Sequence, residues 1–159
     1  IVCNTDENSV ARGNDYTKNI SQKFKNEEIV LISAEIEQQI NELNSVDAKE
    51  FMNEIGLTET GLDRLIKSSY KSLELCTYFT AGPKETKAWT VKENSKAPNA
   101  AGVIHSDFQK GFIKAEVISY QDYLDFNGES GCRDNGKLRI EGRDYIVKDG
   151  DILHFRFNT

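Results

Sequence analysis

Two short polar segments each follow a predicted buried strand, and their residue types suit recognition of a purine base. Asn4-Thr5-Asp6-Glu7 follows the apolar residues 1–3, and Ser33-Ala34 follows the run 28–32. An Asn amide can brace neighbouring loops and reach N7 of a purine, while a carboxylate accepts hydrogen bonds from donors on the base edge. A backbone N–H after the serine offers a donor to the exocyclic group of the base. The predicted base-binding residues are Asn4, Thr5, Glu7, Ser33 and Ala34.

The alternative for these segments is an ordinary polar turn that binds nothing. Asn-rich turns follow many strands, because an Asn side chain hydrogen-bonds to its own backbone. The spacing of the residues alone does not separate the two interpretations.

A second set of candidates for chemistry is His105 with Asp107, which His154 would join as an acid/base group. Such a site needs a partner within hydrogen-bond reach and a cleft. The sequence supplies no nucleophile and no set of metal ligands. We therefore expect no catalytic residue and no metal site in these residues, and a loop-bracing, interface or RNA-contacting role for His105.

A third candidate is a basic surface that carries aromatic side chains, the combination by which proteins bind single-stranded RNA. Its aromatic members would be Trp89, Phe112 and Tyr120. A solvated face of a sheet is the alternative, and RNA binding would be distinguished by a steep loss of affinity with salt. The charged members, with His105, are Lys84, Lys87, Lys110, Lys114, Arg139 and Arg156.

The two polar segments, residues 4–7 and 33–34, each follow a strand of a predicted strand–helix–strand unit. Tyr16, Ile20 and Phe24 recur at helical spacing, so a helix is expected between residues 12 and 25. Residues 28–32 form a continuous apolar run, which is typical of a parallel strand covered on both faces. A right-handed crossover brings both polar loops to one edge of the sheet, where open α/β sheets bind their ligands.

Further amphipathic helices complete the first half. One carries Ile36, Ile40 and Leu43 on its apolar face. Asp47, with Glu50 three residues later, resembles a capping box that opens a second helix, which Gly56 ends. A third helix follows a predicted cap at Thr58. Packing between helices explains these apolar stripes.

The second half begins with two predicted strands, 76–81 and 86–91, joined by a tight hairpin. Residues 97–120 then open at Pro98, pass through a small-residue turn at 100–102 and a polar loop ended by Gly111, and continue as strand 113–120. In this strand Ile113, Ala115, Val117 and Ser119 alternate with the residues between them, which predicts one more buried face. A short helix at 122–126, a glycine-rich connector at 128–136, strands at 138–140 and 145–147, the turn Asp149-Gly150 and a last strand 152–157 follow. This order predicts a mixed sheet with one packed helix, the α+β arrangement of the ubiquitin-like β-grasp.

Composition agrees with an ordinary globular chain. Of 159 residues, 38% are hydrophobic and 29% are charged, and no apolar run is long enough to cross a membrane. Residues 1–75 hold 8 Lys/Arg against 14 Asp/Glu, whereas residues 76–159 hold 12 of each. This shift predicts a domain boundary near residue 75. It also argues against a strong overall attraction to nucleic acid, although a local basic patch on the second half remains possible, and no DNA partner is expected. Three widely spaced cysteines indicate buried free thiols in a reducing cytoplasm.

Several strings of the second half resemble the TGS domain of the YchF/Obg-like ATPase family. The resemblance covers essentially residues 76–159. In the first half, GLDRLIKSSY leads into that domain as it does in the family, and Asn4-Thr5-Asp6-Glu7 is similar to the family's modified version of the NKxD motif. The strings that carry the resemblance are FTAGPKE, KAWT, KAPNAAGVIHSDFQKGF and DYIVKDGDILHFRFN.

The resemblance implies that residues 1–75 are the end of an α/β P-loop nucleotide-binding domain and residues 76–159 a TGS domain. It implies a slow hydrolase that prefers ATP to GTP, uses Mg²⁺, and associates with the ribosome, through its large subunit or ribosomal RNA. Thr5 stands where NKxD has Lys, and Glu7 stands where it has Asp. The Asp of NKxD accepts hydrogen bonds from donors of guanine, whereas adenine has an acceptor at N1. Glu7 is longer than Asp and is expected to swing away from the base, which favours adenine.

The chain also departs from the family, because GxxxxGK[ST] occurs nowhere in it. Since residue 1 is Ile and the chain opens on a predicted strand, we expect it to be a C-terminal piece of a longer protein. The phosphate-binding loop and the Mg²⁺ ligand would lie upstream. The chain alone is therefore expected neither to bind ATP tightly nor to hydrolyse it. The alternative function is a stand-alone ubiquitin-like module that binds protein or RNA without nucleotide chemistry.

Overall fold

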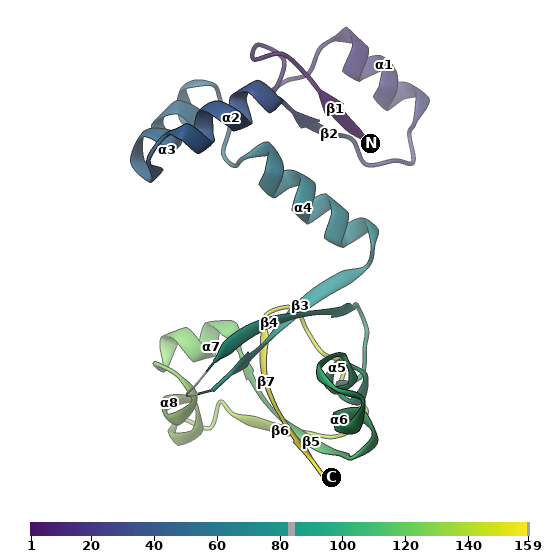
Figure 1. Ribbon diagram of the computed structural model, residues 1–159, viewed down its shortest axis with the longest axis vertical. Helices are drawn as coiled ribbons and strands as arrows, with labels where there is room; N and C mark the ends of the chain where they lie inside the picture. Colours follow the sequence, from purple (N-terminus) through teal and green to yellow (C-terminus); the bar gives the residue numbers. More distant parts are fainter. Residues whose placement is uncertain (83–84, 159) are drawn as a thin grey trace. The chain divides into compact units, whose positions relative to one another are not determined.

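The computed structural model describes residues 1–82 and 85–158. The chain divides into two compact units, the first spanning Ile1–Ser72 and the second beginning at Leu73 (Figure 1). These are unit 1 and unit 2. In the residues that the structure describes, no helix is both long enough and apolar enough to span a bilayer.

Unit 1 opens with a parallel two-stranded sheet, β1 (Val2–Asn4) and β2 (Val30–Ile32), connected through helix α1 (Asp15–Lys23). The predicted strand–helix–strand order is therefore present, with Val2 opposite Val30 and Asn4 opposite Ile32. The apolar stripe predicted for α1 is only partly buried, because Tyr16 is 81% exposed and the buried residue of the helix is Thr17.

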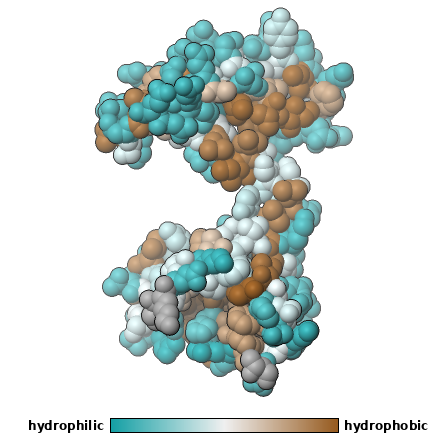
Figure 2. All heavy atoms as spheres, viewed as in Figure 1, coloured by the Kyte–Doolittle hydropathy of each residue, from teal (hydrophilic) through white to brown (hydrophobic). Residues whose placement is uncertain are grey.

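Three further helices complete unit 1: α2 (Ala34–Glu42), α3 (Ser45–Glu54) and α4 (Gly61–Ser72). Its core consists of Val10, Ile36, Ile40, Ala48 and Leu57. Apolar side chains also remain at the surface of the unit, as brown spheres in Figure 2 show, and Leu62 and Ile66 of α4 are 55% and 48% exposed.

Two predicted helix caps in unit 1 are wrong. Helix α3 is capped by Asn44, whose side-chain oxygen accepts from the N–H of Val46 and of Asp47, so Asp47 lies inside the helix. In α4 the Thr60 hydroxyl accepts from Asp63 N–H at 3.0 Å, where Thr58 was predicted to cap. Both helices therefore start where a side chain is close enough to satisfy their first free N–H groups.

Unit 2 is built on a five-stranded sheet of order β4-β3-β7-β5-β6. Strands β3 and β7 pair in parallel, and the other neighbouring pairs are antiparallel. The first and last strands of the unit thus lie side by side in the middle of the sheet (Figure 1). The strands are β3 (Leu75–Ala81), β4 (Thr86–Lys92), β5 (Phe112–Ser119), β6 (Arg139–Glu141) and β7 (Asp151–Phe157).

Helix α5 (Ala97–Ile104) packs its small residues against one face of this sheet. Pro98 lies in its first turn as predicted, but residues 100–102 are part of the helix and not a turn. Ala100 and Ala101 are fully buried, and the Tyr78 hydroxyl donates to the carbonyl of Ala100 at 2.7 Å. The short side chains let the helix backbone approach the sheet closely, which explains why small residues occur here.

The predicted polar loop after α5 is a further short helix, α6 (Ser106–Lys110). Beyond β5 lie α7 (Tyr120–Asp125) and α8 (Glu129–Asp134), the latter within the predicted glycine-rich connector. Residues 145–147 do not form a strand and make a single bridge, between Ile146 and Lys96.

The alternation predicted along β5 fails at its first residues. Ile113 was expected on the buried face, yet Phe112 is buried and Ile113 is 50% exposed. A register shift between Phe112 and Lys114 causes this difference, because one extra residue in a strand reverses the faces of its neighbours.

Candidate functional site

The polar loops after β1 and β2 lie next to each other at the carboxyl ends of the two strands. A hydrogen bond of 3.0 Å joins them, in which Ala34 N–H donates to the side-chain Oδ1 of Asn4. Asn4 and Ala34 are both exposed. The side chain of the first loop therefore braces the second at the sheet edge, and the pair presents a polar surface to solvent.

Thr5 and Ser33, which lie beside this hydrogen bond, make further hydrogen bonds within unit 1. Thr5 donates twice to the carbonyl of Ile32, from its N–H at 2.8 Å and from its hydroxyl at 3.1 Å. Ser33 is buried, with 1% of its surface exposed, and its hydroxyl oxygen caps α2 by accepting from Ile36 N–H. Thr5 and Ser33 thus position the loops, while Asn4 and Ala34 form the exposed part.

One predicted donor is already engaged in this structure. The N–H of Ala34 was expected to face the exocyclic group of a base, but it donates to Asn4. A base that used the Ala34 N–H would have to take it from the Asn4 oxygen.

Glu7 lies apart from these four residues. It is exposed and lines a pocket of about 590 Å³ together with Asn8, Arg12 and residues at the end of α3. Among the described residues, no hydrogen bond or ion pair joins Glu7 to Asn4 or Ala34. The structure thus brings Asn4, Thr5, Ser33 and Ala34 together and leaves Glu7 outside the group.

Sequence reasoning missed Glu37, which lies beside this site. Its carboxylate accepts from the N–H groups of Gly61 at 2.7 Å and of Leu62 at 3.3 Å, so α2 caps the N-terminus of α4. Glu37, Gly61 and Leu62 line a pocket of about 580 Å³ that also includes Ala34. No local sequence pattern predicts this cap, because Glu37 and Gly61 are 24 residues apart in the chain.

The register of the unit 2 sheet distributes the predicted basic surface over both faces. Trp89 lies opposite the core residue Tyr78, so Trp89 and Lys87 belong to the face that α5 covers. The Lys87 ammonium lies 4.0 Å from the centre of the Trp89 ring. Lys114 and its partner Arg156 alternate with core residues and belong to the opposite face.

Two other members of that set, Phe112 and Arg139, are already engaged within unit 2. Phe112 is 3% exposed and belongs to the core, which removes it from the predicted surface. Arg139 donates to the Tyr145 hydroxyl at 3.2 Å and lies near Glu141. Lys110 lies in α6, Tyr120 is 51% exposed, and Lys84 lies outside the described residues.

The candidate acid/base residues do not form one site. His105 is the N-cap of α6, and its Nδ1 accepts from Asp107 N–H at 3.2 Å. His154 lies on β7 between the core residues Leu153 and Phe155, and therefore on the face opposite to theirs. The nearest acid to His105 is Asp107, with 3.4 Å between Nδ1 and Oδ2.

In the described part of the chain, one group of side chains has the types and spacing of a metal-ligand set, namely Glu116, Glu129 and His154. Both carboxylates already have arginine partners. Arg156 binds Glu116 with two hydrogen bonds of 3.2 and 3.1 Å, which lowers the pKa of Glu116, and Arg133 binds Glu129 at 2.8 Å.

All three cysteines are buried and unpaired, as predicted. Burial raises the pKa of the Cys76 and Cys132 thiols above the ordinary value. Their neutral form is therefore favoured, and neither thiol has the features of a nucleophile.

Comparisons with known proteins agree with the resemblance found in the sequence. The family model YchF-GTPase_C, described as "Protein of unknown function (DUF933)", matches residues 75–158. "Ribosome-binding ATPase YchF" of Bacillus subtilis is 47% identical over 162 residues, covering 99% of this chain and 44% of that protein. "Obg-like ATPase 1" of Rattus norvegicus is 44% identical over 131 residues, covering 82% of this chain and 33% of that protein.

A solved structure shares the fold of nearly the whole chain. The structure titled "Structure of the Schizosaccharomyces pombe YchF GTPase" superposes with a TM-score of 0.83 at 31% identity, covering 98% of this chain and 42% of that one. The chain thus spans less than half the length of these relatives. Its sequence and its mixed α/β fold lead to the same conclusion, that the chain belongs to the YchF/Obg-like ATPase family.

Proposed function

We propose that this chain is the C-terminal portion of a ribosome-associated, nucleotide-dependent hydrolase that prefers ATP to GTP. Residues 1–75 would be the end of its P-loop domain and residues 76–159 its TGS domain. The hydrogen bond between Asn4 and Ala34 carries the nucleotide part of the proposal, because it joins the two loops that would frame a base. The ribosome part rests on the names of relatives such as "Ribosome-binding ATPase YchF".

The preference for adenine would arise from Asn4, Thr5 and Glu7. Guanine is bound through an acid that accepts from its N1–H and N2 amino group, whereas adenine has an acceptor at N1. Glu7 has no hydrogen bond or ion pair to Asn4 or Ala34 in the described residues and lines a different pocket, which is compatible with a base site that lacks an acid at that position. In this proposal Asn4 releases Ala34 N–H when the base binds, and Ser33 keeps α2 and its preceding loop in place.

The TGS assignment of unit 2 is supported by its sheet. A β-grasp has its first and last strands parallel at the centre, hairpins on either side and a helix on one face. The order β4-β3-β7-β5-β6 with α5 packed against Tyr78 agrees with that description. We assign this unit as the docking module that contacts the large ribosomal subunit or ribosomal RNA in the cytoplasm, with Lys87, Trp89, His105 and Lys110 as the proposed contact residues on its α5 side.

The phosphates and Mg²⁺ would be bound by residues other than these, since the chain has no GxxxxGK[ST] sequence. The chain alone is therefore proposed to be inactive. Two proteins test this: the chain as it stands, and the chain joined to the upstream coding sequence of its gene.

Isothermal titration with ATP and GTP in the presence of Mg²⁺ measures the nucleotide part. The extended protein is expected to bind ATP more tightly than GTP, Asn4→Ala is expected to weaken binding of ATP about tenfold, and Asn8→Ala serves as the matched control. Tight binding of ATP by the chain alone, or no binding by the extended protein, would contradict the proposal.

Cosedimentation with purified ribosomal subunits measures the docking part separately. The isolated chain is expected to pellet with large subunits, and Lys87→Ala with Lys110→Ala to reduce the bound fraction. Binding of nucleotide without cosedimentation would remove the ribosome from the proposal. Binding of another protein or of RNA, with no nucleotide bound by the extended protein, would favour the stand-alone ubiquitin-like module instead.

A further inference from the structure

The edge of β2 that faces away from β1 has no strand beside it in the described residues. The bonds to β1 use the N–H of Val30 and the carbonyl groups of Glu28 and Ile32. Because successive residues of a strand turn their backbone groups to opposite edges, Ile29 and Leu31 present their N–H and C=O groups to the other side. Such an edge is a template for another extended segment.

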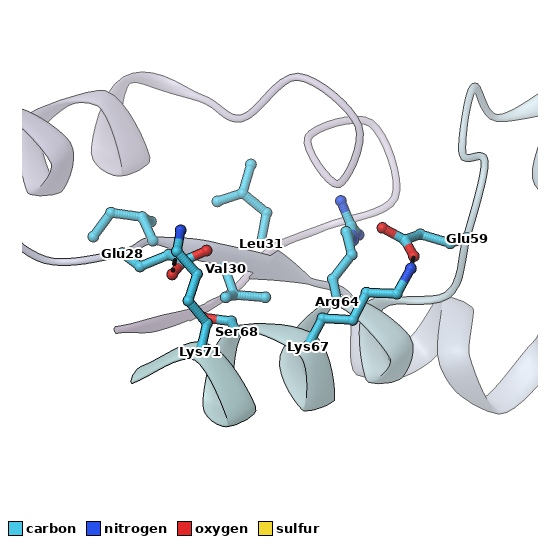
Figure 3. Close-up of a pocket in the computed structure, with 9 residues that line it drawn as sticks. Glu28, Val30, Leu31, Glu59, Arg64, Lys67, Ser68 and Lys71 are labelled. Carbon is cyan, nitrogen blue, oxygen red and sulfur yellow. Dashed lines mark hydrogen bonds and ion pairs between the residues drawn. The ribbon is translucent and has the colours of Figure 1, made fainter. Parts of the chain in front are cut away.

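Two pockets flank this edge, one on each face of the sheet, and Ile29 and Leu31 line both. The pocket on the α4 side has a volume of about 410 Å³. The pocket on the α1 side has a volume of about 390 Å³ and includes Arg12 and Lys18. Figure 3 shows Val30 pointing toward α4 and Leu31 pointing to the opposite side. A strand added here would send alternate side chains into the two pockets.

Arg64 of α4 lines the first pocket and is the unusual residue in it. Its Nε and Nη2 atoms are shielded from water and have no hydrogen-bond partner in the part of the chain that the structure describes. These two nitrogens form one edge of the guanidinium, which matches the two oxygens of a carboxylate. Arg156 binds Glu116 through the same pair of nitrogens. Because both nitrogens are shielded, binding of such a partner requires the Arg64 side chain to turn into the pocket that it lines.

The other charges of this pocket cancel in pairs. Lys67 binds Glu59, and Lys71 lies 3.4 Å from Glu28, as the dashed lines in Figure 3 mark. Arg64 is then the uncompensated charge on the α4 side. On the α1 side Lys18 pairs with Asp15, while Arg12 has no acidic partner among the described residues. Both sides of the open edge are therefore left with a positive charge.

We propose that the open edge of β2 binds an acidic, extended polypeptide segment as an added strand, with one Asp or Glu carboxylate on Arg64. Backbone hydrogen bonds to Ile29 and Leu31 supply affinity, and the two basic pockets supply selectivity for acidic side chains. This surface uses neither the loops proposed to bind the nucleotide base nor unit 2. The tests of this proposal are therefore independent of the tests of the proposed function.

The first test uses acetylated, fluorescently labelled peptides of about seven residues in which Glu alternates with Val or Thr. Fluorescence anisotropy with the 159-residue chain measures their affinity. Arg64→Met is expected to weaken binding about tenfold or more, because the charge and both donors are lost. The exposed Lys49 of α3 provides the matched control, and Lys49→Met is expected to change affinity by less than about twofold. Peptides with Gln in place of Glu repeat the test without altering the protein.

The second test examines the backbone. Hydrogen exchange of the Ile29 and Leu31 amides, followed by NMR, is expected to slow when the acidic peptide binds. Methylation of the peptide nitrogens whose N–H groups face β2 is expected to abolish binding. Methylation of the alternate nitrogens, whose N–H groups face away from β2, is expected to preserve it.

Several outcomes would overturn the proposal. These are equal affinity of Arg64→Met and the wild type, unchanged exchange at Ile29 and Leu31, and no binding of any acidic peptide at about 1 mM. If acetate or inorganic phosphate displaced the peptide at equal concentration, the pocket would be a small-anion site and not a strand-binding edge. If oligouridine bound more tightly and with a steep salt dependence, the partner would be RNA.

Discussion

Asn4 and Ala34 lie 30 residues apart in the chain, yet the Asn4 side-chain oxygen and the Ala34 N–H are 3.0 Å apart. This hydrogen bond links the ends of two parallel strands that pair over three residues, next to the two hydrogen bonds from Thr5 to Ile32. A two-stranded sheet has little stability of its own. The bond therefore contributes to holding the proposed base site in shape.

Replacing Asn4 by Ala is expected to reduce the free energy of unfolding of unit 1 by about 1 kcal/mol, the usual net value of one hydrogen bond. The Ala34 amide should then exchange with solvent several times faster. NMR-detected hydrogen exchange measures this directly. Asn8→Ala, which changes another exposed Asn of the same loop, provides the control. An unchanged Ala34 amide would show that the bond is absent in solution.

Glu37 gives a second prediction, because its carboxylate satisfies the first two N–H groups of α4. Removing a cap of this kind typically costs about 1–2 kcal/mol, so Glu37→Ala is expected to destabilise unit 1 by that amount. Glu37→Gln keeps one acceptor and should lose less. Urea unfolding measures both, with the exposed Glu50→Ala as control. Equal stability of Glu37→Ala and Glu50→Ala would exclude the capping role.

A third prediction concerns Tyr145, whose hydroxyl donates to the buried Asp151 at 2.7 Å. Asp151 is 2% exposed, accepts a hydrogen bond from Lys148 N–H at 2.9 Å, and has the Arg139 guanidinium at 3.9 Å. Tyr145→Phe leaves a buried carboxylate short of a donor, and we expect a loss of about 2 kcal/mol in unit 2. Tyr123→Phe removes a hydroxyl that has no bond among the described residues, and it should change stability little. Thermal unfolding of both variants provides the comparison.

The ion pair between Glu116 and Arg156 is expected to make the stability of unit 2 sensitive to acid. The hydrogen bonds from Arg156 lower the pKa of Glu116 in the folded chain. The pair therefore stabilises unit 2 above the unfolded pKa of about 4.3, and this contribution is lost as the pH falls through the lower, folded value.

The expected contribution is about 1 kcal/mol, since Arg156 is partly exposed and water screens the pair. Urea unfolding at pH 7 and near pH 3 should show a smaller acid-induced loss for Arg156→Met than for the wild type. An equal loss in both would mean that other carboxylates cause the acid sensitivity.

The sequence predicted the order of most elements, because hydrophobic periodicity and glycine or proline signals are local. The strand–helix–strand of unit 1 and the strands that begin and end unit 2 follow from such patterns. The helix caps could not be predicted from such patterns. Asn44 and Asp47 are both residues that can cap α3, and Thr58 and Thr60 are both residues that can cap α4. Which of them caps depends on where the preceding segment ends.

Packing decided the remaining differences. The segment 100–102 is helical because Tyr78 and the sheet bury it, and its small residues gave no sign of that partner. The bulge after Phe112 reversed the faces at the start of β5. The basic residues of unit 2 were predicted as a single surface, but pairing between strands far apart in sequence determines their faces. Arg64 carried no sequence signal, because its lack of a partner is visible only in three dimensions.

The parallel pairing of β3 with β7 also sets an order of events during protein synthesis. Phe79 pairs with Ile152, and β7 lies between β3 and β5 in the sheet. Until residues 151–157 have left the ribosome, the β3–β4 hairpin and the β5–β6 pair have no strand to join them. The edge of β3 that pairs with β7 then stays open while the rest of the unit is made, because closure over so long a separation comes late. Unit 2 is thus expected to complete its fold only after its final strand has been translated.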